Sequence, residues 1–132
     1  MTGIDTNVII RYIVQDDPEQ SLLATQFMEK EISAAEPGVV NAVVLFEVVW
    51  VLRGAYGYTK PDIVRVLEAL LSAAEIDLPR SEAAWKALYL FKRGAADFSD
   101  YFLAEINADH GCETTVTFDK KAGNHSLFTL LD

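Results

Sequence analysis

The sequence predicts an α/β protein in which helices pack on a mainly parallel sheet. Short apolar segments typical of buried strands alternate with longer segments whose apolar residues recur every three or four positions, as in amphipathic helices. Alternating strands and helices of this kind form a parallel sheet covered on both faces, an α/β sandwich. The 132 residues contain no repeat, low-complexity segment or linker, so we expect one domain over residues 1–132.

The first half of the chain predicts two strands and four helices. Asp17, Pro18 and Gln20 form a helix start: an N-cap, a proline at the first helical position and the second partner of a capping box. The pair Pro37 and Gly38 breaks the chain. The expected strands are residues 2–5 and 39–40, and the expected helices are residues 6–14, 18 to about 35, a helix entered through Asn41 that contains Glu47, and a helix from Pro61.

The second half predicts three more strands and two more helices. The first helix opens at Ser81 and closes at Gly94, and the second follows Asp97 and ends near Gly111. The strands are residues 75–79, 114–118 and 127–130. Large aromatic residues at helical spacing, which we expect to be core residues rather than a base-stacking platform, are Trp50, Trp85, Tyr89 and Phe91.

The composition excludes several classes of protein. With 51% hydrophobic and 23% charged residues, the chain is a globular domain rather than a disordered one. The first residues lack a secretory signal, and the longest apolar stretch, residues 39–52, is too short and too polar to span a bilayer. The single cysteine, Cys112, allows no intrachain disulfide, so we expect a reducing cytoplasm and no membrane.

The net charge of −9 argues against a nucleic-acid partner held by bulk electrostatics, because phosphate binding normally uses a basic surface. A cluster of carboxylates neutralised by divalent cations would remove part of this objection.

Glu47 is the most unusual acidic residue in the sequence. In a helix its three- and four-spaced neighbours are Val43, Val44, Trp50 and Val51, all apolar, which predicts a helix buried on every side. Burying an ionised carboxylate costs several kcal/mol unless a basic group, a metal ion or a raised pKa compensates it.

Three aspartates are candidates to share a site with Glu47. Asp5 and Asp119 each end a predicted strand, where ligands bind in open parallel sheets, and Asp100 lies in the first turn of a helix. Four ionised carboxylates would repel strongly, since two charges about 4 Å apart cost roughly 4 kcal/mol at an effective dielectric near 20. A bound Mg²⁺ or Mn²⁺ ion turns this net repulsion into net attraction, and both ions prefer hard oxygen ligands. Carboxylate-bound metal implies phosphoester chemistry.

Each aspartate also has a structural interpretation that the sequence leaves open. Asp5 could cap the helix that begins at Thr6, and Asp119 could be a turn residue. Asp97 and Asp100, three positions apart, could be the two partners of a capping box. No phosphate-binding glycine loop, serine elbow or Cys/His nucleophile pair offers another chemistry.

Four ordered segments make the chain similar to the PIN-domain family, and within it to VapC-like toxins of prokaryotic toxin–antitoxin pairs. These segments are residues 4–9, 46–52, 97–104 and 111–119. The resemblance implies a three-layer α/β/α sandwich and a Mg²⁺- or Mn²⁺-dependent endoribonuclease whose metal is held by Asp5, Glu47, Asp100 and Asp119. Tyr101 and Phe102 depart from the smaller or aliphatic residues common in the family.

The resemblance also implies supporting residues and partners. Asp97 would be an additional acid outside the quartet, and Thr6, Asn7 and Thr117 would hydrogen-bond to the ligands. The protein would form a homodimer neutralised by a cognate antitoxin. From their positions near the acids, the candidate contacts to RNA phosphates are Arg11, Lys92, Arg93, Lys120 and Lys121.

Two other functions remain open at this stage. A receiver-like signalling domain would bind Mg²⁺ beside a phosphorylated aspartate, but it usually has paired acids at the first strand, which Asp5 lacks. A PIN-like fold that has lost catalysis could act as a protein-binding module.

Overall fold

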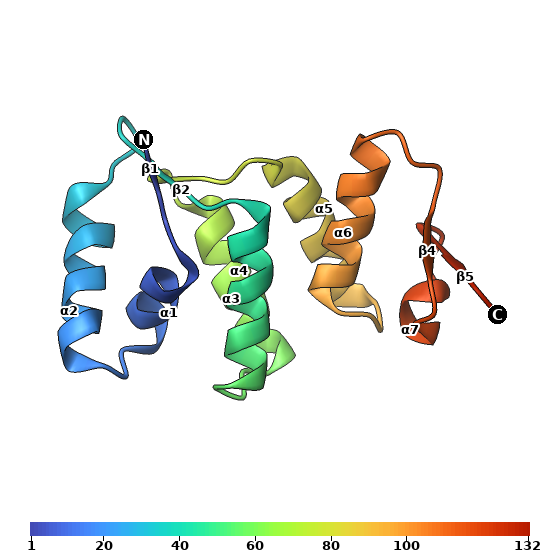
Figure 1. Ribbon diagram of the computed structural model, residues 1–132, viewed down its shortest axis with the longest axis horizontal. Coiled ribbons are helices and arrows are strands. Elements are labelled where there is room, and N and C mark those ends of the chain that lie inside the picture. Colours follow the sequence, from blue (N-terminus) through green and yellow to red (C-terminus); the bar gives the residue numbers. More distant parts are fainter. The chain divides into compact units, whose positions relative to one another are not determined.

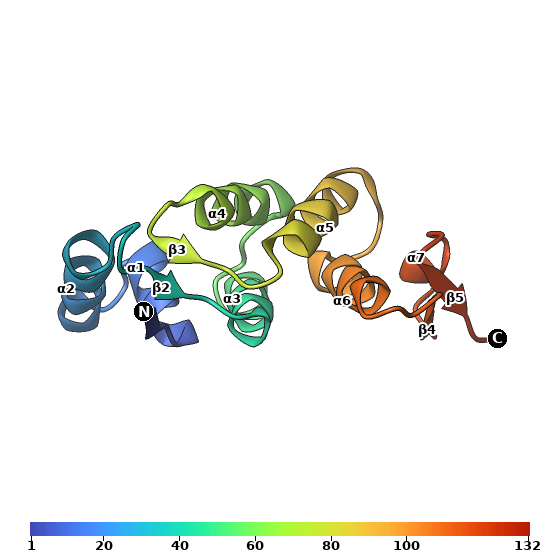
Figure 2. The same cartoon turned by 90° about the horizontal axis from the view of Figure 1, so that it is seen from above.

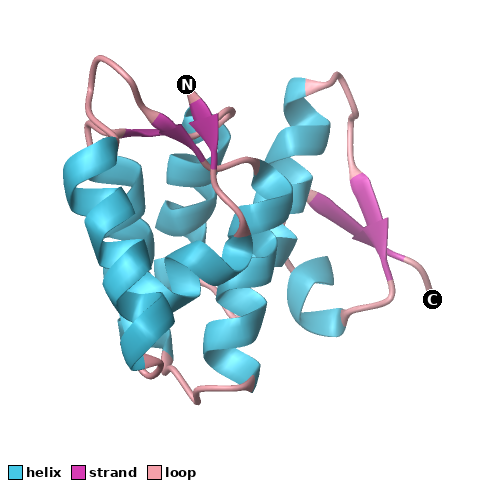
Figure 3. Ribbon diagram, turned by 60° about the vertical axis from the view of Figure 1, so that its left-hand side comes forward, coloured by secondary structure: helices cyan, strands magenta, loops and turns pink.

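The computed structural model describes all 132 residues, and the chain divides into two compact units, Met1–Pro79 and Arg80–Asp132. Helices account for most of the ribbon in Figure 3, and every strand pairs with its neighbour in the parallel direction. The predicted α/β class with a parallel sheet is therefore confirmed. One domain over residues 1–132 stays a prediction.

The first unit contains three strands and the helices that connect them (Figure 1). Its sheet has the order β1-β2-β3, with Thr2 opposite Gly38 and Gly38 opposite Ile76; β2 and β3 run side by side in Figure 2. In chain order the elements are β1 (Thr2–Gly3), α1 (Thr6–Val14), α2 (Pro18–Gln26), the π-helical turn η1 (Phe27–Glu31), β2 (Gly38–Val39), α3 (Ala42–Gly54), α4 (Lys60–Ser72) and β3 (Ile76–Asp77).

Side-chain caps fix where these helices begin. Asp17 accepts a hydrogen bond from the backbone N–H of Gln20 at 3.0 Å, as the sequence predicts for an N-cap. The capping box is only half formed, because the Gln20 side chain accepts from Arg11 instead. Asn41 caps α3 by accepting from the N–H of Val44 at 3.0 Å. The helix from Pro18 ends at Glu31, four residues earlier than expected.

The prediction that the Glu47 helix is buried on every side is wrong. One side of α3 packs in the core through residues such as Leu45, Val48 and Leu52. On the other side Val43 is 65% exposed, Trp50 is 79% exposed and Glu47 is also exposed, since α1 and α4 contact only part of the helix circumference. The Glu47 carboxylate therefore needs no compensation for burial.

The second unit contains two long helices followed by a strand-helix-strand segment (Figure 1). The strands β4 and β5 are parallel, with Thr115 opposite Phe128, and the short helix α7 connects them. In neither unit does a helix have the length and apolarity needed to cross a bilayer. The elements are α5 (Ser81–Arg93), α6 (Phe98–Asp109), β4 (Thr115–Thr117), α7 (Lys120–Gly123) and β5 (Phe128–Leu130).

Aromatic side chains form the core between α5 and α6. Phe98 contacts Phe91 and Phe102 with ring centroids 6.3 Å and 5.4 Å apart, and all three rings are buried. Tyr101 is buried as well, and its hydroxyl accepts from the backbone N–H of Ala96 at 3.4 Å. Tyr101 and Phe102, the departure from the family pattern, are therefore core residues of this unit.

The expectation that the four large helical aromatics lie in the core is correct only for Phe91. Trp50, Trp85 and Tyr89 are 79%, 42% and 57% exposed. In α5 the inward positions are occupied by Ala83, Ala84, Ala87, Leu88 and Phe91, so Trp85 and Tyr89 face outward.

Candidate metal centre

Asp5 lies directly after β1 and occupies the N-cap position of α1. Its backbone is extended, as expected of an N-cap, but its carboxylate makes no capping hydrogen bond and is exposed. Asp5 is therefore an N-cap in its backbone conformation only. Its side-chain oxygens remain available as ligands.

Glu47 is connected to the same end of α1 through Thr6. The Thr6 hydroxyl, on a residue only 6% exposed, donates a hydrogen bond to Glu47 Oε1 at 3.1 Å. Because Thr6 follows Asp5 in the chain, this bond ties the α3 carboxylate to the residue next to Asp5. The hydrogen bond orients the Glu47 carboxylate, and a supporting role of Thr6 beside metal ligands stays a prediction.

Asp5 also lines a groove of about 520 Å³ within the first unit. Asn7 and Arg11 line it too, and apolar side chains such as Leu23 and Phe27 form much of its wall. Asn7 is exposed beside Asp5, which suits the supporting role expected of it.

Asp100 lies in the first turn of α6, where three acids of the second unit influence one another. Partial burial raises the pKa of Asp100, and the negative charges of Asp119 and Asp97 raise it further, while a hydrogen bond from the backbone N–H of Asp97 at 3.2 Å opposes the shift. That hydrogen bond belongs to the capping box that Asp97 and Asp100 form at the start of α6, which is the structural role that the sequence had left open for these two residues. The main cause of the raised pKa is burial of the Asp100 carboxyl, and its two acidic neighbours add to it.

Asp119 has both a turn role and a place in the acidic region. Its carboxylate accepts from the backbone N–H groups of Lys121 at 2.8 Å and Ala122 at 3.3 Å, which caps α7. Thr117, predicted to support the ligands, accepts from the backbone N–H of Asp119 at 3.0 Å and so fixes the start of this turn.

A polar cleft of about 350 Å³ lies beside Asp119 within the second unit. Asp97 and Asp119 line it together with Lys120 and Lys121. The cleft thus combines carboxylates that suit a metal ion with ammonium groups that suit a phosphate.

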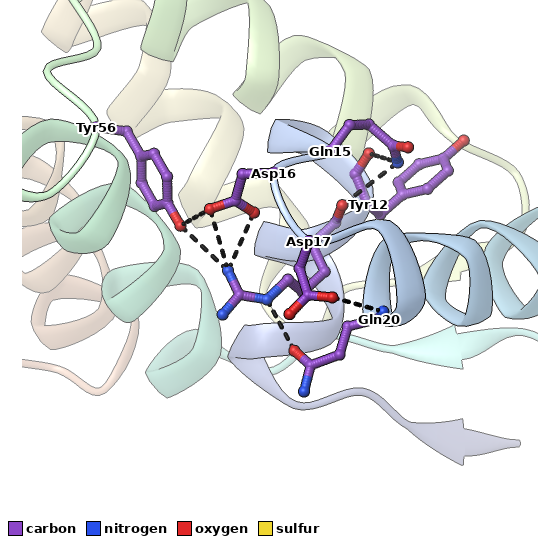
Figure 4. A network of polar contacts seen from close by, with 7 residues as sticks. Tyr12, Gln15, Asp16, Asp17, Gln20 and Tyr56 are labelled. Carbon is purple, nitrogen blue, oxygen red and sulfur yellow. Dashed lines mark hydrogen bonds and ion pairs between the residues drawn. The ribbon is translucent and has the colours of Figure 1, made fainter.

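Arg11, one of the five predicted phosphate contacts, already has protein partners, and Figure 4 labels three of them, Asp16, Gln20 and Tyr56. Its guanidinium donates to Asp16 at 3.2 Å and to the Tyr56 hydroxyl at 3.1 Å, and its Nε donates to Gln20 at 2.8 Å. The hydrogen bond from Tyr56 is the main cause that lowers the pKa of Asp16. No local pattern in the sequence indicates this network, because Tyr56 lies 45 positions from Arg11.

The two cations of α5 lie in its last turn. Lys92 and Arg93 are both exposed, and the Arg93 guanidinium lies 3.8 Å above the centroid of the Tyr89 ring. Arg93 therefore forms a cation–π contact with Tyr89, as guanidinium groups often do with aromatic rings.

The four predicted ligands are divided between the units, with Asp5 and Glu47 in the first and Asp100 and Asp119 in the second. Within neither unit are three Asp, Glu, His or Cys side chains arranged to hold a metal ion. The donor types nevertheless fit a hard divalent cation, because all four are carboxylates. The pKa of Asp100 is raised mainly by burial and further by the charges of Asp119 and Asp97, so a cation bound beside Asp100 would favour its ionised form.

The sequence model of the PIN domain matches residues 4–125, a span that includes all four acids. No curated protein matches the chain.

Proposed function

Because the chain belongs to the PIN-domain family, whose domains are generally metal-dependent nucleases, we propose that it is an endoribonuclease that hydrolyses RNA phosphodiester bonds with Mg²⁺ or Mn²⁺. The observation that carries the proposal is the match over residues 4–125, which contains every acid of the predicted quartet. The match gives no support to the receiver-like alternative.

In this proposal Asp5, Glu47, Asp100 and Asp119 hold the metal. Three features support these assignments. The Asp5 carboxylate caps nothing, the Glu47 carboxylate is oriented by Thr6, and the pKa of Asp100 is raised by burial and by its acidic neighbours. Asp97 contributes negative charge from the N-cap position of α6 without being one of the four ligands.

A divalent cation held by these oxygens would supply an activated water at neutral pH and would neutralise charge on the phosphate. The protein residues orient and balance this chemistry. Thr6 keeps Glu47 in one orientation, Thr117 fixes the turn that presents Asp119, and Asn7 offers an amide beside Asp5.

Phosphate binding is the proposed role of the basic residues. Lys120 and Lys121 are the best placed, since both line the cleft that contains Asp97 and Asp119. Lys92 and Arg93 are exposed at the end of α5. Arg11 would act within its network with Asp16 and Tyr56, so it would bind phosphate less readily than an unpaired cation.

The finer assignment is that the protein is a VapC-like toxin, active as a homodimer and neutralised by a cognate antitoxin. It rests on the sequence resemblance in the four motif segments, which lie at the expected spacing along the chain. Co-expression with the protein encoded beside it, followed by a growth assay, tests this part separately from the nuclease activity.

The central experiment measures cleavage of single-stranded and structured RNAs with Mg²⁺, with Mn²⁺ and with EDTA. We expect cleavage only with a divalent cation, and we expect Asp5→Asn to abolish it while retaining the fold. Asp109→Asn is the matched control, because Asp109 is an exposed carboxylate outside the quartet. Its activity should equal that of the wild type.

Metal binding provides a second readout that does not depend on finding the correct RNA. Mn²⁺ titration followed by electron paramagnetic resonance should detect binding by the wild type and by Asp109→Asn, and weaker binding by Asp5→Asn. Cleavage that survives both EDTA and Asp5→Asn would eliminate metal-dependent catalysis. Absence of both Mn²⁺ binding and cleavage would favour a protein-binding module.

A further inference from the structure

The outer side of α5 carries an unusual combination of residues. Trp85, Lys86, Tyr89 and Arg93 are all exposed on this helix, and we call them the aromatic-basic face. The helix is marked α5 in Figures 1 and 2, where it runs beside α6, with which it forms the core of the second unit. The face lies entirely within that unit.

The two aromatic residues can act together. Trp85 and Tyr89 are four positions apart, so they lie on the same side of the helix and about 6 Å apart along its axis. They line a groove of about 400 Å³ together with Lys86, Leu90 and Glu105. The two rings therefore present neighbouring apolar surfaces next to a cation.

These aromatics are not needed to complete the core. The inward stripe of α5 is already formed by small and apolar residues, and Leu88 and Phe91 are each 1% exposed. A helix with a complete inward stripe normally carries polar residues on its outer side. Two large exposed rings on that side are therefore features that the folding of α5 does not explain.

The charge of this helix differs from that of the whole protein. The chain has 11 Lys and Arg residues and a net charge of −9, yet three of its cations, Lys86, Lys92 and Arg93, fall within the last eight residues of α5. Within α5 the one acid is Glu82, in the first turn; Glu105 lies in the groove, and Asp97 follows four residues after Arg93. The C-terminal part of α5 is thus a local positive region on an acidic protein.

Arg93 and Tyr89 already form the type of contact that stacks with a nucleobase. The guanidinium lies 3.8 Å from the Tyr89 ring centroid and also donates to the Tyr89 carbonyl at 3.4 Å. Tyr89 remains 57% exposed in spite of this contact. A base and a guanidinium can therefore share the ring, while the guanidinium remains close enough to the surface to meet a phosphate.

We propose that the aromatic-basic face of α5 binds single-stranded RNA, with bases stacked on Trp85 and Tyr89 and with Lys86 and Arg93 contacting the phosphates. Exposed aromatic rings beside cations are the usual platform for unpaired bases, whereas bases in a duplex are already stacked on one another. The choice of RNA rather than DNA rests on the proposed function. A protein partner would need a larger continuous apolar patch than two rings provide.

The face would also reconcile RNA binding with the acidity of the chain. Stacking is not an interaction between net charges, so an acidic protein can use it where bulk attraction is absent. The few cations then need to attract only those phosphates that lie within one Debye length, roughly 8 Å at physiological salt.

The test is a binding measurement in EDTA, where metal-dependent cleavage cannot occur. The protein carries Trp50→Phe, which leaves Trp85 as the only tryptophan, and is titrated with an unstructured oligouridine of about 12 nucleotides. We expect quenching of Trp85 fluorescence. Trp85→Leu and Tyr89→Leu, measured with a labelled oligonucleotide, should each lower the affinity about tenfold, the effect of losing one stacked base.

Matched variants separate stacking from folding. Trp85→Phe keeps an aromatic ring and should retain most of the affinity, whereas Trp85→Leu keeps only apolar packing. Circular dichroism should give the same spectrum for both. Lys86→Ala should weaken binding and reduce its salt dependence by about one ion. An abasic ribose-phosphate chain of equal length should bind much more weakly than oligouridine.

The inference is overturned if both leucine variants bind as tightly as the wild type, or if the abasic chain binds equally well. Absence of binding at low salt would also overturn it and would favour a protein partner for this face. These outcomes are independent of catalysis. Binding through Trp85 without cleavage in Mg²⁺ would reject only the nuclease proposal, and cleavage by a protein whose leucine variants bind oligouridine as tightly as the wild type would reject only this face.

Discussion

Replacing Gly94 by alanine tests how tightly Tyr101 is packed in the second unit. Gly94 is the C-cap residue of α5. A methyl group added there would overlap the Tyr101 hydroxyl and would lie 2.8 Å from Cζ of the ring and 3.0 Å from the carbonyl oxygen of Leu90. Gly94→Ala therefore requires the Tyr101 ring to move.

The cost of this movement follows from the packing around Tyr101. The residue is 2% exposed, and its ring meets the His125 ring edge-on with centroids 5.6 Å apart, so little free space is available. The Leu90 carbonyl cannot retreat easily, because it accepts the N–H of Gly94 at 2.8 Å. Overpacking of this kind costs about 1–3 kcal/mol, which lowers Tm by roughly 5–10 °C for a chain of this length.

The assay compares thermal unfolding of Gly94→Ala with that of Gly54→Ala. Gly54 is the control because a methyl group there meets no atom within 4 Å, and the change should stay within about 0.5 kcal/mol. Adding Tyr101→Phe to Gly94→Ala should recover part of the stability by removing the hydroxyl. The same Tm for Gly94→Ala and the wild type would refute the argument.

Three further predictions concern the acids and their neighbours. Thr6→Val should lower cleavage about 10–100-fold by releasing Glu47, while Thr6→Ser retains activity, and equal rates for the two would contradict this. In EDTA, Asp100→Asn should raise Tm at pH 7, since a raised carboxyl pKa means that the ionised form destabilises the folded state. Calorimetry at falling pH should show that this gain in Tm disappears below about pH 3.9, where Asp100 is protonated in the folded and the unfolded state. A gain in Tm that does not depend on pH would refute the raised pKa of Asp100. Thr59→Ala breaks the capping box with Asp62 and should cost about 1 kcal/mol in urea unfolding while the cleavage rate of folded protein stays the same; a change in that rate would be unexpected.

Local signals predicted the helix boundaries well. Asp17, Asn41 and Gly94 each occupy the terminal position that the sequence indicated, because caps depend on a few adjacent residues. The helix after Pro18 was overextended. The last five residues of the observed helix, Phe27–Glu31, form a π-helical turn, and Ile32 after them is extended. The spacing of apolar residues predicts neither feature.

Burial was harder to predict, because it depends on what packs against each helix. The sequence shows that α3 is apolar on every side but not that Glu47 and Trp50 remain uncovered. The same limitation applies to Trp85, whose helical spacing suits a core residue as well as an exposed one.

Asp5, Asp100 and Asp119 were proposed from their positions at strand ends and a helix start, whereas Glu47 was proposed from an expected burial that the structure does not show. Sequence alone could not distinguish a ligand from a cap, because both use a carboxylate at the same position. The structure separates the cases only partly. Asp5 makes no capping hydrogen bond, whereas Asp100 and Asp119 both accept from backbone N–H groups.

The hydrogen bonds of Asp119 affect how related sequences should be compared. Two backbone N–H groups at the start of α7 depend on its carboxylate, so a relative without nuclease activity would still benefit from an acid or an asparagine there. Retention of this position is therefore weak evidence that a relative is active. The Asp5 side chain makes no such capping hydrogen bond, so under the proposed function its loss or retention would be the more informative marker of catalysis across the family.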